Sequence, residues 1–377
     1  MRGYGAEAGR RGKIQDEGRS NDECEFLEQI GPPPMKAIVI HAPGDLRYDE
    51  VAEQSLGAGE VRVKIAVGGI CGSDLHYYRH GGFGAVRLRH PMVLGHEIAG
   101  VIVETGRDVG SLRTGQRVAV NPSLSCGSCA YCRKGLSNHC TDMRFYGSAM
   151  RTPHVDGGFR ETLVCKAEQA VPVPDALTNS DAAFAEPVAV CLHAASRGGP
   201  LLGKTALVSG AGPIGAILAI ILRSAGASWI AVTDLIDEPL RRATELGADE
   251  TINVAKEADR LAEKQAGRGT FDIVFEASGS AAAAASALDV VKPRGTVVYV
   301  GQGARPEINI STIVTKEIDV IGAFRFIDEF KQAVDYIARN RAQIRSLLTA
   351  AVPASDPMSA FDLAADKARS LKVHLEF

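Results

Sequence analysis

The fold is decided by the stretch Thr205-Ala206-Leu207-Val208-Ser209-Gly210-Ala211-Gly212-Pro213-Ile214-Gly215. An apolar strand runs into the pattern G-x-G-x-x-G, and an apolar helix is predicted to follow over residues 213–225. In this strand–loop–helix context the glycines allow a tight turn and bring a pyrophosphate close to the helix N-terminus. The stretch therefore predicts a dinucleotide-binding βαβ unit, whose cofactor contacts are Gly210, Gly212, Pro213, Ile214 and Gly215.

Asp234 closes the next predicted strand and favours NAD as the dinucleotide. A carboxylate at this place accepts hydrogen bonds from the adenosine ribose hydroxyls and repels a 2′-phosphate. Arg241 and Arg242 follow it and leave NADP possible, although they also fit a solvated helix face. A Rossmann domain for FAD or S-adenosylmethionine is the alternative interpretation.

The sequence outside this unit predicts an α/β protein of two domains. Strands are expected near residues 229–233, 250–253, 271–276, 296–300 and 319–323, with helices between them, which indicates a doubly wound parallel sheet of about six strands. The preceding region is β-rich, and the chain ends in an alternating strand at 371–377. We expect a β-rich catalytic domain (35–183 and 323–377) interrupted by a Rossmann domain (184–322). Residues 1–34 are predicted to be a disordered extension, and Met35 fits a natural start.

Composition narrows the classes of partner. The 377 residues carry a formal charge of −3, which does not favour nucleic acid, and no apolar run approaches the ~20 residues that span a bilayer. The eight cysteines include four within a short stretch, a pattern typical of metal binding rather than of disulfides. Without a recognisable secretion signal, a reducing cytoplasm is the expected compartment.

The cysteine cluster is Cys126-x2-Cys129-x2-Cys132-x7-Cys140. Four closely spaced thiolates can close a tetrahedron around Zn²⁺ within one loop. Because all four positions are then filled by protein, this zinc is expected to be structural. An iron–sulfur cluster is the alternative.

A second metal site is predicted around Leu94-Gly95-His96-Glu97-Ile98-Ala99-Gly100. A catalytic zinc takes three protein ligands and keeps one position open. Cys71 and His96 are two candidate ligands, and the third is either Glu97 or Glu186. Cys191 competes with Glu186, but five residues along a predicted helix place the two side chains ~140° apart. Cys191 and Cys165 are therefore expected to be buried as small apolar groups.

Ser73 and His76 lie just after Cys71 and offer a hydroxyl and an imidazole for a proton relay. The alternatives are a helix cap for Ser73 and a surface position for His76.

Together these motifs resemble the zinc-dependent medium-chain dehydrogenases from about Met35 to Phe377. The residues that carry the resemblance are Gly95-His96-Glu97-x2-Gly100-x5-Gly106, Cys71-Gly72-Ser73-Asp74-x-His76, the cysteine cluster and the glycine loop. The resemblance implies a GroES-like domain with a catalytic and a structural zinc, a Rossmann domain for NAD, and a homodimer or homotetramer. Glu186-Pro187 in place of a cysteine ligand is similar to the polyol dehydrogenase branch, which includes sorbitol dehydrogenase. Gly322-Ala323-Phe324-Arg325-Phe326 also resembles that branch and implies a substrate role for Arg325 and Phe326.

Three further stretches resemble the enzymes of this branch that act on L-idonate. They are Gly72–Tyr78, Asn121-Pro122-Ser123 and Cys140–Met150 with its continuation to Phe159. The resemblance implies hydride transfer between NAD and the C5 hydroxyl of L-idonate, giving 5-keto-D-gluconate. In this hypothesis the zinc lowers the pKa of the hydroxyl, and its proton leaves through Ser73 and His76. Glu186 orients a water or binds the metal.

Several alternatives stay open on the sequence alone. A carboxylate substrate needs a cation, for which Arg325, Arg144 and the Arg79–His90 loop are candidates. Other substrates of the same class are sorbitol, xylitol or L-threonine. Two different classes are a zinc-free reductase of quinones or enones and a non-catalytic NAD-binding protein. The combination of Cys71, His96 and Glu186 disfavours the first, and an open metal site beside the relay residue His76 disfavours the second.

Overall fold

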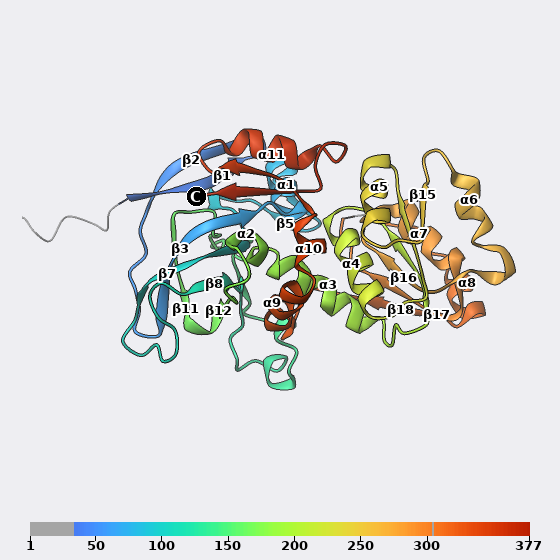
Figure 1. The fold of residues 1–377 in the computed structure, drawn as a ribbon, viewed down its shortest axis with the longest axis horizontal. Helices are drawn as coiled ribbons and strands as arrows, with labels where there is room; N and C mark the ends of the chain where they lie inside the picture. Colours follow the sequence, from blue (N-terminus) through green and yellow to red (C-terminus); the bar gives the residue numbers. More distant parts are fainter. Residues whose placement is uncertain (1–33, 304) are drawn as a thin grey trace, which may run out of the picture.

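A computed structural model describes residues 34–303 and 305–377 of the chain. Two large sheets form the two halves of the molecule, and helix α3 (Ala185–Arg197) lies between them (Figure 1). The predicted extension at residues 1–34 lies outside the described residues apart from Pro34, and so does Cys24. Within the described ranges, no helix combines the length and the apolar content needed to cross a bilayer.

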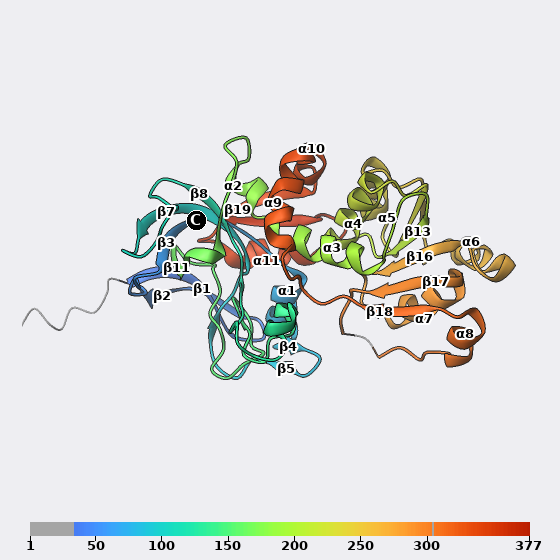
Figure 2. The same ribbon diagram turned by 90° about the horizontal axis from the view of Figure 1, so that it is seen from below.

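One half is built on a six-stranded parallel sheet with the order β15-β14-β13-β16-β17-β18 (Figure 2). Its strands are β13 (Thr205–Ser209), β14 (Trp229–Asp234), β15 (Glu250–Asn253), β16 (Phe271–Glu276), β17 (Val291–Tyr299) and β18 (Asp319–Gly322). The helices between them are α4 (Pro213–Ser224), α5 (Asp237–Glu245), α6 (Ala258–Glu263), α7 (Ala281–Val290) and α8 (Ile310–Lys316). The strand order reverses next to β13. Right-handed crossovers therefore place the helices of one half of this sheet on one face and those of its other half on the opposite face. The predicted doubly wound sheet is confirmed, with its cofactor crevice expected at this reversal.

The predicted strands agree closely with the observed ones except at β17. The sequence predicts this strand over residues 296–300, after the turn-forming residues Pro293 and Gly295. The strand begins instead at Val291 and contains an irregularity opposite Phe271–Ile273, with Arg294 in a left-handed conformation (φ 61°). The turn-forming residues are accommodated as a bulge within the strand.

The other half is β-rich and contains both ends of the described chain. Its main sheet has the order β12-β8-β7-β3-β20-β19, with β11 also paired to β3, and a smaller sheet has the order β2-β1-β6. The strands are β1 (Pro34–Ala42), β2 (Asp45–Ala52), β3 (Glu60–Gly69), β6 (Met92–Val93), β7 (Glu97–Thr105), β8 (Arg117–Val120), β11 (Thr162–Lys166), β12 (Ala170–Pro172), β19 (Leu348–Pro353) and β20 (Lys372–Glu376). Two-residue strands complete it: β4 (Gly82–Phe83), β5 (Val86–Arg87), β9 (Ser123–Leu124) and β10 (Arg144–Phe145).

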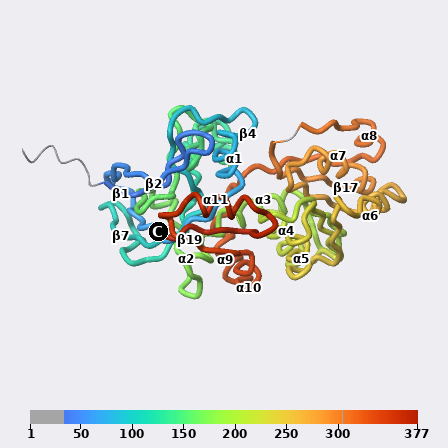
Figure 3. Tube along the Cα trace, turned by 90° about the horizontal axis from the view of Figure 1, so that it is seen from above, coloured from blue at the N-terminus to red at the C-terminus, as the bar shows by residue number. Residues whose placement is uncertain are grey.

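Strand β20 shows how the C-terminal segment returns to the first half of the chain. It pairs antiparallel with β3, with His374 opposite Gly69, and parallel with β19. The C-terminus therefore lies among strands from the N-terminal region (Figure 3). This arrangement fits a β-rich domain interrupted by a Rossmann domain, while the limits at residues 183/184 and 322/323 stay predictions.

The remaining α-helices are α1 (Gly72–His80), α2 (Asn179–Ala182), α9 (Glu329–Arg339), α10 (Arg341–Arg345) and α11 (Pro357–Ala365). Of these, α9 packs against α3, whereas α1 and α11 pack against strands of the β-rich half. A continuous apolar core runs through α3, α4 and α9 and includes Phe184, Phe326 and Phe330. Because α3 contributes to this core along its length, its first turn, which carries Glu186, is held firmly between the two halves.

Candidate active site

Cys71, His96 and Glu97 converge at the edge of the β-rich half. One ligand atom from each lies within 4.8 Å of the other two. Cys71 precedes α1, and its backbone N–H donates to the Asp74 carboxylate at 3.0 Å, which fixes the start of the helix. Gly95 has φ 95°, and a side chain there would overlap the ring of Phe159, so only glycine allows the turn that presents His96.

Buried charge surrounds these three residues. His96 is 5 % exposed and Glu97 1 %, while the fully buried Asp74 lies 3.8 Å from Nδ1 of His96. Burial, reinforced by Glu97, raises the pKa of the Cys71 thiol to about 12. A buried thiolate next to two carboxylates is stable only if a cation neutralises it. The donor set of sulfur, imidazole and carboxylate suits zinc, and Asp74 adds a second carboxylate near His96 without a hydrogen bond between the two in this structure.

Lys372, the first residue of β20, contributes a buried positive charge to this site. It forms an ion pair with Glu97 in which both side chains are 2 % exposed, and it donates to the carbonyl of Ile70 at 3.0 Å. The pKa of Lys372 is raised: burial opposes the charged form, but Glu97 and Cys71 favour it more. Glu97 is thus both within reach of a metal and held by a buried cation.

Glu186 lies outside the compact group of Cys71, His96 and Glu97 but belongs to the same electrostatic environment. It is 6 % exposed in the first turn of α3. Burial raises its pKa to about 8, with His96 opposing this and Glu97 and Cys71 adding to it. Cys191 lies on the same helix, fully buried, with its sulfur 3.5 Å from the carbonyl of Ile214. Cys165 is buried as well, so both cysteines have the expected apolar surroundings.

Ser73 and His76 lie three residues apart on α1. Ser73 is half-buried, and its hydroxyl interacts with the Cys71 sulfur in a way that lowers the thiol's pKa. His76 is exposed, between the rings of His80 and Phe83. Burial of its inner edge lowers the pKa of His76, and the charges of His80, Lys367 and Arg79 lower it further. Within the described chain, no hydrogen bond joins Ser73 to His76, so their relay stays a prediction.

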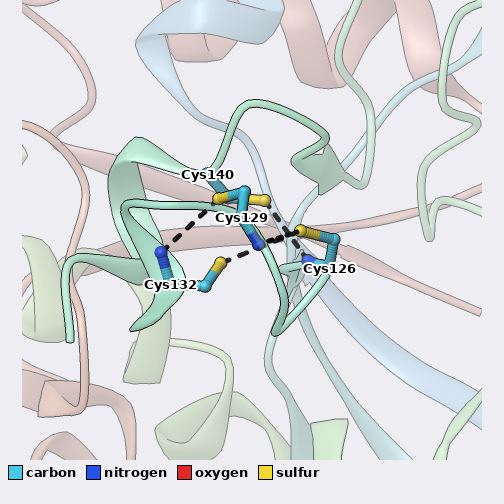
Figure 4. A group of neighbouring side chains, drawn as sticks. All are labelled: Cys126, Cys129, Cys132 and Cys140. Carbon is cyan, nitrogen blue, oxygen red and sulfur yellow. Dashed lines mark hydrogen bonds between the residues drawn. The ribbon is translucent and has the colours of Figure 1, made fainter. Parts of the chain in front are cut away.

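The four clustered cysteines form the second metal-binding group. Their sulfur atoms all lie within 4.8 Å of one another, and Cys126 and Cys132 are 4.0 Å apart (Figure 4). Four thiolates on one zinc are separated by about 3.8 Å, so the group already has nearly the required spacing. Backbone N–H groups donate to three of the sulfurs: Cys126 to Cys140 (3.2 Å), Cys129 to Cys126 (3.4 Å) and Cys132 to Cys129 (3.4 Å). Such bonds lower the pKa of Cys129 to about 5, which favours the metal-binding thiolate.

The dinucleotide loop lies between β13 and α4, as predicted. A side chain at Gly215 would meet the carbonyl oxygen of Gly210 at 1.8 Å, whereas one at Gly212 would meet open space. The loop is therefore packed against itself on one side and open on the other, where a pyrophosphate can approach. Asp234 ends β14, and its carboxylate accepts from the backbone N–H of Ala211 at 2.8 Å.

The two arginines after Asp234 are engaged elsewhere. Arg241 and Arg242 both contact Glu238, at 2.7 and 3.1 Å, and Arg241 also pairs with Glu245. This matches the interpretation of a solvated helix face.

The ring of Phe145 lies between Arg325 and His96 of the candidate metal site. The guanidinium of Arg325 stacks 4.1 Å above the ring of Phe145, which is 5.5 Å from the ring of His96. Burial lowers the pKa of Arg325 to about 10, and Glu186 opposes this. Among the described residues no carboxylate forms an ion pair with Arg325.

The other substrate candidates lie further from this position. Phe326 is 2 % exposed and packs against Phe330 in the core, and it is Phe324, with Phe145, that faces the guanidinium of Arg325. Arg144 is exposed on β10, and Arg87 and Arg89 of the Arg79–His90 loop are exposed. A cavity of about 140 Å³ adjoins Arg325 and is lined by Phe145, Ser148 and Met150, among others.

A Rossmann sheet with a glycine loop, joined to a β-rich half that carries two cysteine-containing groups of metal ligands, defines a zinc-binding dehydrogenase. Residues 57–175 match the family model of the alcohol dehydrogenase GroES-like domain, and residues 213–339 match that of the zinc-binding dehydrogenases. The chain belongs to the zinc-dependent medium-chain dehydrogenases, in the group that contains polyol and sugar-acid dehydrogenases.

The individual relatives are dehydrogenases of sugar acids and polyols. The chain is 42 % identical over 316 residues to L-idonate 5-dehydrogenase (NAD(P)(+)) of Escherichia coli K12, a match that covers 84 % of this chain and 91 % of that protein. It is 36 % identical over 325 residues to sorbitol dehydrogenase of Bacillus subtilis, covering 84 % and 90 %. The crystal structure of the E. coli L-idonate 5-dehydrogenase superimposes with a TM-score of 0.87 at 39 % identity, covering 92 % of this chain and 99 % of that one.

Proposed function

We propose that the protein oxidises L-idonate at C5 to 5-keto-D-gluconate, with NAD as the hydride acceptor, and catalyses the reverse reduction. The observation that carries this proposal is the guanidinium of Arg325, which has no carboxylate partner among residues 34–303 and 305–377 and lies beside the predicted catalytic metal site. An acid substrate supplies such a partner, and a bidentate Arg–carboxylate pair is strong when partly buried. Similarity to the E. coli L-idonate 5-dehydrogenase supports the choice of sugar acid.

In this proposal each residue has a distinct task. Cys71 and His96 would hold the catalytic zinc, with Glu97 as the carboxylate within reach, and a metal bound there would supply Lewis-acid polarisation of the substrate hydroxyl. Glu186 accepts a hydrogen bond from the substrate or a water on the open side of the site. Ser73 accepts the departing proton and His76 passes it to solvent, because the two lie on one face of α1. The four clustered cysteines hold the structural zinc.

Replacing Arg325 with alanine is expected to raise the KM for L-idonate about 100-fold. This rise corresponds to about 2.7 kcal/mol, which is reasonable for the loss of a charge-assisted pair. The KM for NAD should remain within about twofold. Steady-state kinetics with each substrate varied in turn measures both constants. Arg144→Ala, which removes an exposed arginine, is the matched control, and an unchanged KM for L-idonate in Arg325→Ala would remove the substrate role.

Asp234→Asn is expected to weaken the preference for NAD. The amide keeps an oxygen for the backbone N–H of Ala211 but loses the charge that repels a 2′-phosphate. We expect kcat/KM for NAD to fall about tenfold. The ratio of kcat/KM for NAD to kcat/KM for NADP should fall further, which corresponds to a loss of roughly 1.4 kcal/mol or more in discrimination between the cofactors. Kinetics with both cofactors tests this, with Arg241→Ala as a control on the same surface. A wild-type enzyme that prefers NADP would contradict the assignment to NAD.

A second candidate function is a sorbitol- or xylitol-type polyol dehydrogenase, favoured by the similarity to the B. subtilis sorbitol dehydrogenase. Rates with L-idonate, sorbitol, xylitol and L-threonine, each with NAD and NADP, separate these substrates. A neutral polyol gives Arg325 no carboxylate, so a KM for sorbitol lower than that for L-idonate would favour the polyol function.

The quaternary structure that we propose is a homodimer or homotetramer. Ile310 and Val314 of α8 and Val320 of the edge strand β18 are exposed at 63 %, 68 % and 46 %. An exposed apolar patch on a sheet edge favours contact with another copy. We also propose a reducing, cytoplasmic location, because all seven cysteines in the described part of the chain are unbridged.

A further inference from the structure

The backbone that carries Arg325 is held from three directions. Before it, the N–H of Ala323 donates to the carbonyl of Tyr299 at 2.9 Å, which ties the segment to β17 of the Rossmann sheet. After it, the N–H of Ile327 donates to the carboxylate of Glu329 at 2.6 Å, and that carboxylate also contacts Nδ1 of His193 on α3 at 2.9 Å. Only Phe324 and Arg325 lie between Ala323 and the buried Phe326, and their support comes from elsewhere.

That support comes from the four-cysteine lobe, residues 126–140. Asn138, which is 4 % exposed between Cys132 and Cys140, donates through its Nδ2 to the carbonyl of Phe324 at 2.9 Å. The ring of the adjacent His139 stacks on Phe324 at 6.2 Å. A single side-chain amide thus bridges two segments that are 186 residues apart.

Arg325 needs this support because of its backbone conformation. Its φ is 53°, in the left-handed region, which is unfavourable for a residue with a side chain. Such a conformation persists only where the surroundings impose it. The carbonyl bonded by Asn138 belongs to the peptide unit directly before Arg325, so this bond restricts the rotation that would let Arg325 relax.

The relaxed conformation would misplace the guanidinium. In the structure it stacks at 4.1 Å on Phe145 and at 4.9 Å on Phe324. The ring of His139 stacks in turn on Phe324. The lobe therefore supports both the backbone before Arg325 and one of the two aromatic rings on which its guanidinium stacks.

We propose that Asn138 is a positioning residue for substrate recognition: it couples the four-cysteine lobe to Arg325 by fixing the Phe324 carbonyl. The lobe then serves as a template that holds the substrate arginine beside the catalytic site, in addition to its own folding. This inference rests on the proposed function, in which Arg325 binds the substrate carboxylate.

The test is a double-mutant cycle in the full-length, zinc-loaded enzyme, with Asn138→Ala, Arg325→Ala and the double variant. We expect Asn138→Ala to raise the KM for L-idonate about tenfold, with kcat and the KM for NAD within about twofold and the zinc content at its wild-type value. Because Asn138 acts through Arg325, the double variant should match Arg325→Ala alone rather than show the product of the two effects. Ser137→Ala, in the same turn, is the matched control and should leave the KM for L-idonate unchanged.

A second variant covers the case in which Asn138→Ala fails to fold. Asn138→Asp keeps the shape but replaces the donating NH₂ with an acceptor, and the same rise in KM is expected. Multiplicative effects in the cycle, equal rises in KM for both substrates, or a wild-type KM in both Asn138 variants would overturn the proposal. If the wild-type enzyme oxidises sorbitol but not L-idonate, the proposed function fails, and the same cycle measured with sorbitol still decides whether Asn138 acts through Arg325.

Discussion

His96→Ala is expected to abolish turnover and to lower the zinc content by about one equivalent per chain. His96 is one of three candidate ligands whose donor atoms lie within 4.8 Å of one another, and its replacement leaves too few ligands for a stable site. Loss of the Lewis acid removes the stabilisation of the developing alkoxide, which is worth several kcal/mol, so kcat should fall by on the order of 10³-fold or more. Steady-state kinetics and metal analysis of the purified variant measure both effects.

The remaining zinc of His96→Ala provides an internal control. The four clustered cysteines lie in a different loop, so their ion should stay bound and the variant should keep its folded structure. His41→Ala removes a surface histidine that pairs with Asp49, and it should leave both the zinc content and the rate at wild-type values. Full activity in His96→Ala would remove His96 from the catalytic site, and loss of both ions would show that the two metal positions are not independent.

The Rossmann half could be predicted almost residue by residue because its signals are local. The strand before Gly210, the glycine pattern and the apolar helix after it adjoin one another in sequence, and each of the later strands is an apolar run bounded by polar turns. The difference at β17 also arises from a local signal. A proline and a glycine near residue 294 predict a turn when read alone, but the pairing of Val291 and of Thr296 with β16, on either side of the segment, keeps it in the strand.

Candidate metal ligands could be singled out in the sequence, because cysteine and histidine next to glycine carry recognisable patterns. The residues that complete the site could not, because their partners are distant in sequence. Lys372 appears as one polar residue in an alternating strand, and only the pairing of β20 with β3 brings it to Glu97 and Ile70. Asn138 carries no local signal for the same reason, since its partner Phe324 is 186 residues away. For Asp74 a signal existed: its position three residues after Cys71 fits a capping box, whose carboxylate accepts from the backbone N–H of Cys71.

Lys372→Met is expected to cause the largest loss of stability among single substitutions at this site. Lys372 and Glu97 form an ion pair with 2 % exposure on each side, so removing the lysine leaves a buried carboxylate without its counter-charge. Breaking one side of a buried ion pair costs about 3–5 kcal/mol, because the desolvation of the remaining charge is no longer offset. The substitution also leaves the carbonyl of Ile70 without its hydrogen bond. Thermal unfolding of the zinc-loaded protein should show a midpoint lower by several degrees.

Two companion variants separate charge from packing in that result. Lys372→Arg keeps the positive charge and should recover most of the stability, whereas the double variant with Glu97→Gln removes both charges and should be more stable than Lys372→Met alone. If Lys372→Met is as stable as the wild type, the charge of Glu97 is neutralised by another group, and a zinc held by Cys71 and His96 would be a cation within reach of it. That outcome would favour Glu97 as the third metal ligand, whereas a marked loss of stability would show that Lys372 is the main counter-charge of this carboxylate.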